Sequence, residues 1–373
     1  MYMPIIIKEV KTNSEIKQFV RFPFQLYKGN KNWVPPLIDS EVKSLTEMNP
    51  ARDFCDSRFF LAFKEGKCVG RIGAIINKSY NEKVNTKFGR INRIEFIDDY
   101  EVSENLINTA IEWFKEQQME YVHGPLGYTN LDTQGLLIEG FDYIQSIASV
   151  YHLPYYQEHF NRLNFEKEND WIEFRLTITE APLEKAKRGA ELVKKRYGVE
   201  VINFSSIAEL DPYKKKVFQI LNDAFQFLPY VSPLNDKMIQ LYADKYFKIL
   251  NPRFIKVVTK DKEPIGFFVG LPSLSKAMQK ANGKLFPFGF YHLLKALKKP
   301  EVIDMLLTGV LQDYQNAGIA VILISELQQE MVKAGVLELE TTGVFESNHN
   351  VIANWKNYEH IQHKRRRCYV KKI

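Results

Sequence analysis

A short glycine-containing loop in the second half of the 373-residue chain has the composition of a phosphate-binding turn. It lies between an apolar, strand-like segment and a long amphipathic stretch. Its residues are Gln315, Asn316, Ala317, Gly318, Ile319 and Ala320. Small residues let backbone N–H groups approach a phosphate, and the first turn of a helix presents unpaired N–H groups and the positive end of its dipole. The loop therefore indicates an anionic ligand bound at a helix N-terminus.

The elements around this loop belong to a repeat that relates the two halves of the chain. Residues 5–10 and 199–204 both predict a strand followed by a Ser/Thr-to-Glu capping box, and they lie 194 residues apart. Residues 58–74 and 253–270 both predict a β-hairpin, at an offset of 195 to 196 residues. Because separate elements share nearly one offset, the sequence indicates an internal duplication.

Each half is predicted to run strand, helix, hairpin, strand, helix, strand, helix, strand. Apolar residues recur at helical spacing in the two longest helical segments. This alternation predicts an α/β fold with mixed (α+β) sheets and helices packed on their faces. We expect a first domain at 1–178, a connecting helix at 179–196 and a second domain at 197–373.

The two halves differ where the phosphate loop should recur. In the first half, residues 98–104 (DDYEVSE) take its place, with four acidic side chains and no glycine. These carboxylates would repel a pyrophosphate, so the anionic ligand is expected in the second half only. Two turn-rich stretches of the first half, 123–135 and 151–156, are expected either to line a substrate groove or to pack the two domains against each other.

The loop follows the pattern Q/R-x-x-G-x-G/A between a strand and a helix, and it resembles the acyl-CoA pyrophosphate motif of the GCN5-related N-acetyltransferase (GNAT) superfamily. The preceding strand, 306–310, resembles the one that pairs with pantetheine, and 346–353 resembles the asparagine-led start of the last helix. The usual Gly-Phe after the C-terminal tyrosine is absent, because Glu359 and His360 follow Tyr358. The resemblance implies a tandem duplicated acyl-CoA N-acyltransferase (GNAT-like) fold whose N-terminal half has lost its cofactor site.

The resemblance also implies an activity, the transfer of an acetyl or longer acyl group from acetyl-CoA or another acyl-CoA to an amine. The acceptor would be a small molecule or a peptide. Tyr358 is the expected acid for the departing thiolate, and Glu340 and Glu346 are the nearest carboxylates that could act as a base through water. The implied cofactor-binding residues are Val310, Gln315, Asn316, Ala317, Gly318, Ile319, Ala320 and Asn350.

Two other functions remain open at this point. One is transfer from a different activated carrier, because two-domain GNAT-like folds include aminoacyl-tRNA-dependent and acyl-carrier-protein-dependent transferases. The other is a non-catalytic binding protein with a decayed acyltransferase fold, because the acid and base candidates occupy unremarkable sequence positions.

The composition limits the classes of ligand and the cellular location that we expect for this protein. The 51 basic and 45 acidic residues leave a net charge of +6, which suits an anionic ligand and argues against nucleic acid. Cys55, Cys68 and Cys368 form no CxxC pair, and no metal-ligand spacing occurs, so we expect a reduced cytoplasmic protein without a metal. The longest apolar run, 318–325, is shorter than the roughly 20 residues of a membrane span. The sequence leaves monomer and homodimer open.

A basic and apolar insertion at 271–300 has no counterpart in the first half. Two interpretations follow from its composition. It is either a helical lid over an acyl or substrate pocket, or a buried packing arm.

Overall fold

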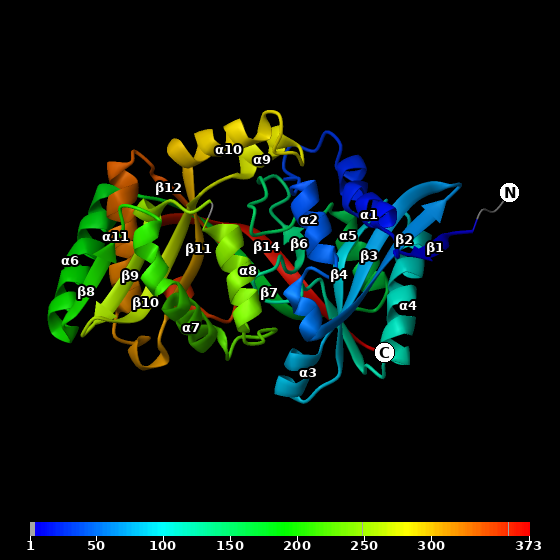
Figure 1. The fold of residues 1–373 in the computed structure, drawn as a ribbon, viewed down its shortest axis with the longest axis horizontal. Coiled ribbons are helices and arrows are strands. Elements are labelled where there is room, and N and C mark those ends of the chain that lie inside the picture. Colours follow the sequence, from blue (N-terminus) through cyan, green and yellow to red (C-terminus); the bar gives the residue numbers. More distant parts are fainter. Residues whose placement is uncertain (1–3, 248, 357) are drawn as a thin grey trace. The chain divides into compact units, whose positions relative to one another are not determined.

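The computed structural model describes residues 4–247, 249–356 and 358–373, and the chain divides into two compact units (Figure 1). Each unit draws on both halves of the sequence. Unit 1 takes in the residues up to 172, 275–292 and 364–373. Unit 2 takes in 173–274 and 293–363.

Unit 1 contains a sheet whose strands pair in the order β1-β2-β3-β4-β5, antiparallel up to β4 and parallel between β4 and β5. Helix α4 buries Leu106, Ala110 and Phe114 in the core of this unit. The elements are β1 (Ile6–Glu9), α1 (Asn13–Leu26), α2 (Ile38–Leu45), η1 (Pro50–Asp53), β2 (Cys55–Lys64), β3 (Lys67–Asn77), α3 (Lys78–Val84), β4 (Phe88–Phe96), α4 (Tyr100–Glu116), β5 (Tyr121–Gly124), β6 (Leu136–Glu139), α5 (Tyr155–Arg162) and α9 (Ser275–Ala281).

Unit 2 repeats this arrangement. Its strands pair in the order β8-β9-β10-β11-β12, again antiparallel until the last pair, β11 with β12, which is parallel. The elements are α6 (Glu180–Tyr197), β8 (Val199–Asn203), η2 (Ala208–Tyr213), α7 (Lys214–Phe225), α8 (Asp236–Tyr246), η3 (Pro252–Phe254), β9 (Ile255–Lys260), β10 (Glu263–Pro272), β11 (Val302–Val310), η4 (Gln312–Tyr314), α11 (Ile319–Lys333), β12 (Glu338–Thr341), β13 (Val344–Phe345) and α12 (His349–Ala353). The predicted α/β fold and its duplication are confirmed.

The last strand of each half completes the sheet of the other half. Strand β14 (Glu359–Lys372) pairs through residues 369–372 with β5 in unit 1, and β7 (Glu166–Thr177) pairs through residues 175–177 with β12 in unit 2. The two compact units do not coincide with the expected domains at 1–178 and 197–373, because both terminal strands contribute residues to both units. β5 and β12 are equivalent strands of the duplicated sheet, and each pairs with the terminal strand of the other half.

The stretch expected to connect the halves is helix α6, and it is part of unit 2. Lys194 of α6 contacts Glu326 of α11 at 2.6 Å, and the helix ends at Gly198, whose φ of +62° suits a left-handed C-cap. The helix starts differ between the repeats. Thr12 and Glu15 form the expected capping box of α1, whereas Pro212 in a 3₁₀ segment precedes α7.

Among the described residues, no helix is both long enough and apolar enough to cross a membrane.

Candidate functional site

Strands β11 and β12 of unit 2 diverge and leave one edge of β11 without its parallel partner. The ladder between them ends at Met305 and Thr341, and Thr342 adds two further hydrogen bonds, from its N–H to the Met305 carbonyl and from its hydroxyl to the Leu306 carbonyl. Strand β11 continues to Val310, held on its other side by β10. An edge with backbone N–H and C=O groups can pair with an extended amide-containing ligand.

The glycine-containing loop follows directly after this edge. Gly318 is the N-cap of α11 with a φ of +78°, and no side chain of the described residues caps the helix. This positive φ is a backbone conformation that glycine adopts readily and other residues rarely do. A β-carbon at Gly318 would also lie 3.0 Å from the Val193 side chain. Gln315 and Asn316 are exposed, and the Gln315 side chain donates to the Val310 carbonyl at 3.4 Å.

The electrostatics of this helix end suit an anion. The first turn of α11 contains no acidic residue, so the N-terminal N–H groups and the helix dipole are not neutralised locally. Lys260 adds a positive charge nearby, with its Nζ 5.6 Å from the ring centre of Tyr314 in the preceding 3₁₀ turn. The sequence reasoning missed Lys260, because it lies at the end of β9, far away along the chain.

Tyr358 packs onto the same helix. Its hydroxyl donates to Oε1 of Gln328 in α11 at 3.0 Å, and burial raises the pKa of Tyr358 above its usual value. Nε2 of Gln328 and Nε1 of Trp355 are buried, and within the described part of the chain neither atom has a hydrogen-bond partner. Two buried donors thus lie near Tyr358. Gln328 could not have been singled out from the sequence, because it resembles any other polar residue of an amphipathic helix.

The two carboxylate candidates occupy different environments. Glu340 lies in β12, one residue before the strands diverge, and is 5% exposed. Arg175 donates to its Oε1 at 2.9 Å, and Nε2 of His363 lies 3.6 Å from its Oε2. Glu346 follows β13 and is half-buried. The sequence analysis missed this ion pair, because 165 residues separate Arg175 from Glu340.

The remaining cofactor candidate, Asn350, is exposed on the short helix α12. The capping residue of that helix is Asn348, whose side chain accepts from the Val351 N–H. Val310, Gln315, Gly318 and their neighbours lie together at the end of β11, whereas Asn350 lies on α12 and, among the described residues, makes no hydrogen bond to them.

The equivalent helix end in unit 1 is closed to anions. Asp99 caps α4 by accepting from the Glu101 N–H, and Lys64 contacts the Asp99 carboxylate at 2.7 Å. The side-chain hydrogen bond from Lys64 is the main cause that lowers the pKa of Asp99, so this carboxylate is ionised at neutral pH. In unit 1, the Asp99 carboxylate of segment 98–104 therefore supplies the negative charge at the helix N-terminus, where an anionic ligand would otherwise bind.

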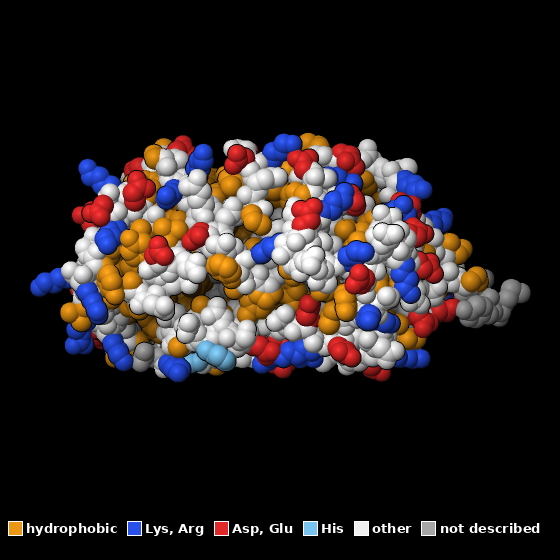
Figure 2. Space-filling view, turned by 90° about the horizontal axis from the view of Figure 1, so that it is seen from below, with side chains coloured by type: hydrophobic (Ala, Val, Ile, Leu, Met, Phe, Trp, Pro, Cys, Tyr) orange, Lys and Arg blue, Asp and Glu red, His pale blue; other side chains and the backbone are white. Residues whose placement is uncertain are grey.

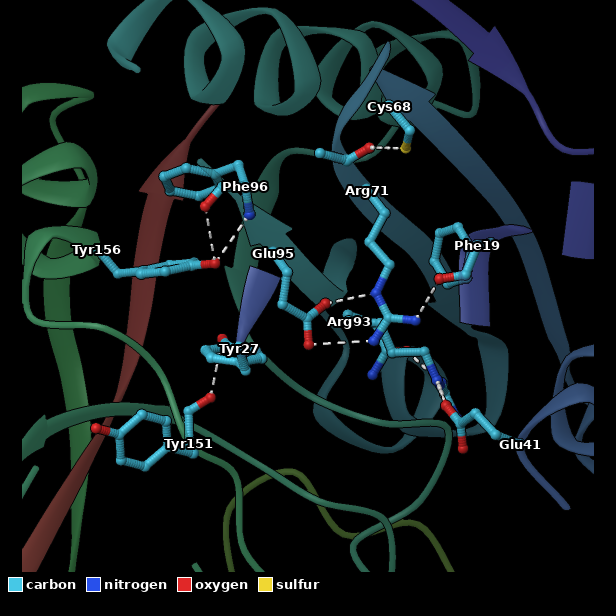
Figure 3. Close-up of polar contacts among 12 residues, drawn as sticks. Phe19, Tyr27, Glu41, Cys68, Arg71, Arg93, Glu95, Phe96, Tyr151 and Tyr156 are labelled. Carbon is cyan, nitrogen blue, oxygen red and sulfur yellow. Dashed lines mark hydrogen bonds and ion pairs between the residues drawn. The ribbon is translucent and has the colours of Figure 1, made fainter. Parts of the chain in front are cut away.

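The ladder between β4 and β5 in unit 1 ends at Arg90 and His123, and side chains contact β4 beyond this point; Figure 3 shows Tyr156 beside Phe96. The Tyr156 hydroxyl accepts from the Phe96 N–H at 2.8 Å and donates to the Phe96 carbonyl at 3.2 Å, at the end of β4. Nearer the start of β4, Asn92 donates to the carbonyl of Leu126, two residues after the end of β5, at 2.8 Å. A ligand could pair with this strand only by displacing these groups.

Neither turn-rich stretch of unit 1 presents its histidine to solvent. His123 is fully buried and stacks on Phe88, with 4.4 Å between ring centres. His152 is 3% exposed, and its Nδ1 accepts from the Leu137 N–H at 3.2 Å. Both histidines therefore lie within the packing of unit 1.

The burial of His152 predicts an acid-sensitive stability. Burial, reinforced by Arg366, lowers its pKa from 6.5 to about 3, so the folded chain keeps the imidazole neutral. Below pH 6.5 the unfolded chain binds a proton that the folded chain does not, so stability is lost as the pH falls. We expect this residue to lower the free energy of unfolding by roughly 2 kcal/mol at pH 5 relative to pH 7, measured by urea unfolding.

His152→Asn keeps an acceptor near the Leu137 N–H and cannot take up the proton, so this part of the pH dependence should disappear. His349→Asn, at an exposed site, should leave it unchanged. Identical pH profiles for wild type and His152→Asn would contradict the assignment.

Comparison with known sequences places the chain near two bacterial proteins. It is 28% identical to Protein YghO of Escherichia coli K12 over 375 residues, covering 99% of this chain and 95% of that protein. It is 27% identical to the bacterial ceramide synthase of Caulobacter vibrioides over 316 residues, covering 83% of this chain and 81% of that protein. No protein-family model matches the chain.

Comparison with solved structures establishes the fold. A tandem GNAT protein from the clavulanic acid biosynthesis pathway matches 100% of this chain and 98% of its own, with a TM-score of 0.57 and 10% identity. A GCN5-related N-acetyltransferase from Sphaerobacter thermophilus matches 99% and 95%, with a TM-score of 0.53 and 12% identity. The chain has the tandem GNAT fold.

Proposed function

We propose that this chain, which has the tandem GNAT fold, is an N-acyltransferase that uses acyl-CoA at unit 2 and acylates a long-chain lipid amine. The observation that carries the proposal is the end of β11. An unpaired strand edge leads into a left-handed glycine and an uncapped helix N-terminus without acidic residues. The equivalent places in unit 1 are occupied by Tyr156 and Asp99.

In this proposal, the backbone N–H groups of residues 316–320 bind the pyrophosphate, and Lys260 contributes positive charge. The pantetheine amides pair with β11 between Leu307 and Val310, and Asn350 makes a further contact with the cofactor. Backbone N–H groups near Gly309 stabilise the negative charge that develops on the thioester oxygen. No step requires a metal.

The acceptor class is suggested by the relative from Caulobacter vibrioides, which is named a ceramide synthase. A ceramide is the amide of a fatty acid with a long-chain amino alcohol, so forming one requires acyl transfer to an amine. Similarity over 83% of the chain includes most of both units. We place the reaction in the cytoplasm, in keeping with Cys55, Cys68 and Cys368, which form no disulfide within the described part of the chain.

The chemistry is a direct transfer. The amine nitrogen attacks the thioester carbonyl, a C–N bond forms and the C–S bond breaks. Tyr358, which stays protonated because its pKa is raised, gives its proton to the departing thiolate. The amine proton passes to His363, which Glu340 orients while Arg175 balances the carboxylate charge. Glu346 is the alternative base, acting through water.

The test is an acyl transfer assay with palmitoyl-CoA and a saturated C18 2-amino-1,3-diol, read by mass of the amide and by release of CoA thiol. The wild type should form the amide. Tyr358→Phe should lower kcat by roughly 100-fold, because a general acid contributes about this much, and should leave the Kd for palmitoyl-CoA unchanged. Tyr197→Phe, at the end of α6, serves as the matched control and should retain full activity.

Two results would contradict the proposal. The acceptor is wrong if thiol is released with other amines and not with the long-chain amino alcohol. The donor site is wrong if palmitoyl transfer occurs only from acyl carrier protein.

A further inference from the structure

The insertion at 271–300 exposes a concentrated set of large apolar side chains. Among the described residues, fourteen large apolar side chains are exposed, and six of them fall within ten consecutive positions of this insertion. They are Leu285 (39% exposed), Phe286 (75%), Phe288 (71%), Phe290 (43%), Tyr291 (58%) and Leu294 (51%). The segment is therefore neither a buried packing arm nor a linker of ordinary polarity.

The base of the insertion is anchored to unit 1. Gln279 of α9 donates to the carbonyls of Lys31 at 2.8 Å and Trp33 at 2.9 Å, and the Ile38 N–H donates to the Gly283 carbonyl at 2.9 Å. A β-carbon at Gly283, which has a φ of +80°, would lie 2.7 Å from Phe24. The exposed apolar side chains within 285–294 therefore follow closely after a segment, 279–283, that is hydrogen-bonded to unit 1.

The insertion is also strongly basic compared with the rest of the chain. Residues 271–300 contain six lysines and no acidic residue, so this segment alone carries the net charge of +6 of the whole chain. The other residues are balanced, and Figure 2 shows acidic and basic side chains interspersed over the face that it presents. The six lysines are Lys276, Lys280, Lys284, Lys295, Lys298 and Lys299.

We propose that this insertion, which includes α10 (Gly289–Lys298), docks the protein on the surface of an anionic lipid bilayer (Figure 1). Phe286 and Phe288 enter the boundary between headgroups and acyl chains, and the lysines contact anionic headgroups. A bilayer fits better than an acidic protein, because lysine is depleted at protein interfaces and a lipid surface requires no matching shape. The inference goes beyond the proposed acyl transfer and rests on a different surface.

The experiment is vesicle flotation of the full chain. Vesicles of 70% phosphatidylcholine and 30% phosphatidylglycerol should bind the wild type, pure phosphatidylcholine vesicles should bind it weakly, and high salt should release it. Phe286→Ser/Phe288→Ser should weaken binding roughly 10- to 100-fold. Lys295→Glu/Lys298→Glu/Lys299→Glu should weaken binding by at least about 100-fold.

Matched controls change the same residue types elsewhere. Phe227→Ser removes a phenylalanine that is 73% exposed, and Lys214→Glu/Lys215→Glu/Lys216→Glu makes the same change of charge on α7. Both should bind anionic vesicles like the wild type, and all variants should keep the wild-type unfolding temperature. Three outcomes would overturn the proposal: equal binding by both triple-lysine variants, insertion-dependent binding to purified acyl carrier protein without vesicle binding, or insertion-dependent self-association in sedimentation.

Discussion

Replacing Gly318 with glutamate is expected to weaken acyl-CoA binding by at least about 100-fold, because two like charges near 4 Å repel by about 4 kcal/mol at the effective dielectric near a protein surface. The new carboxylate would lie at the N-terminus of α11, where our proposal places the pyrophosphate. It would also bring to unit 2 the arrangement that Asp99 creates in unit 1. The measurement is the Kd for palmitoyl-CoA by isothermal titration calorimetry.

Gly335→Glu is the matched control. Gly335 follows the other end of α11, has a φ of +73°, and would place its β-carbon in open space. Both variants therefore carry a similar backbone penalty, and only Gly318→Glu puts charge at the proposed phosphate site. Equal Kd values for the two variants would show that the loop does not bind the pyrophosphate.

Replacing Arg71 with methionine is expected to lower the free energy of unfolding by about 3–5 kcal/mol, because it leaves the charge of Glu95 without its partner in a largely buried setting. Arg71 is 5% exposed, and its Nε and Nη2 contact the Glu95 carboxylate at 2.6 and 3.1 Å (Figure 3). Its Nη1 also donates to the Phe19 carbonyl at 2.8 Å. Urea unfolding measures the loss.

A double-mutant cycle separates the ion pair from simple packing. In Arg71→Met/Glu95→Met the unpaired carboxylate is gone, so most of the lost stability should return. Lys78→Met provides the surface comparison, because its pair with Asp56 is about half exposed on both sides and should matter by less than about 1 kcal/mol. Additive effects at Arg71 and Glu95 would mean that the two charges do not interact in solution.

Much of the architecture was predictable, because local patterns and a constant offset carry it. The hairpins, the long helices and the repeat all follow from periodicity within short windows. The acidic segment at 98–104 is distinguished from the glycine loop by charge alone, and in the structure Asp99 of this segment caps a helix.

What the sequence could not predict depends on contacts between distant residues. Periodicity identifies β7 and β14 as strands, but it does not say which edge each strand joins, because the duplicated edges are equivalent. Glu340 was expected to act through water, and its pairing with Arg175 appears only when β7 lies beside β12. The exposure of Phe286 and Phe288 likewise depends on how α9 is anchored.

The exchange of β7 and β14 also has a consequence for biosynthesis. Strand β5 emerges from the ribosome long before β14, so the edge that β14 covers stays open while the whole second half is being made. During that interval the nascent N-terminal half presents a strand edge of the kind that recruits chaperones or aggregates. Completion of the unit 1 sheet at β5 therefore waits for the last residues of the chain.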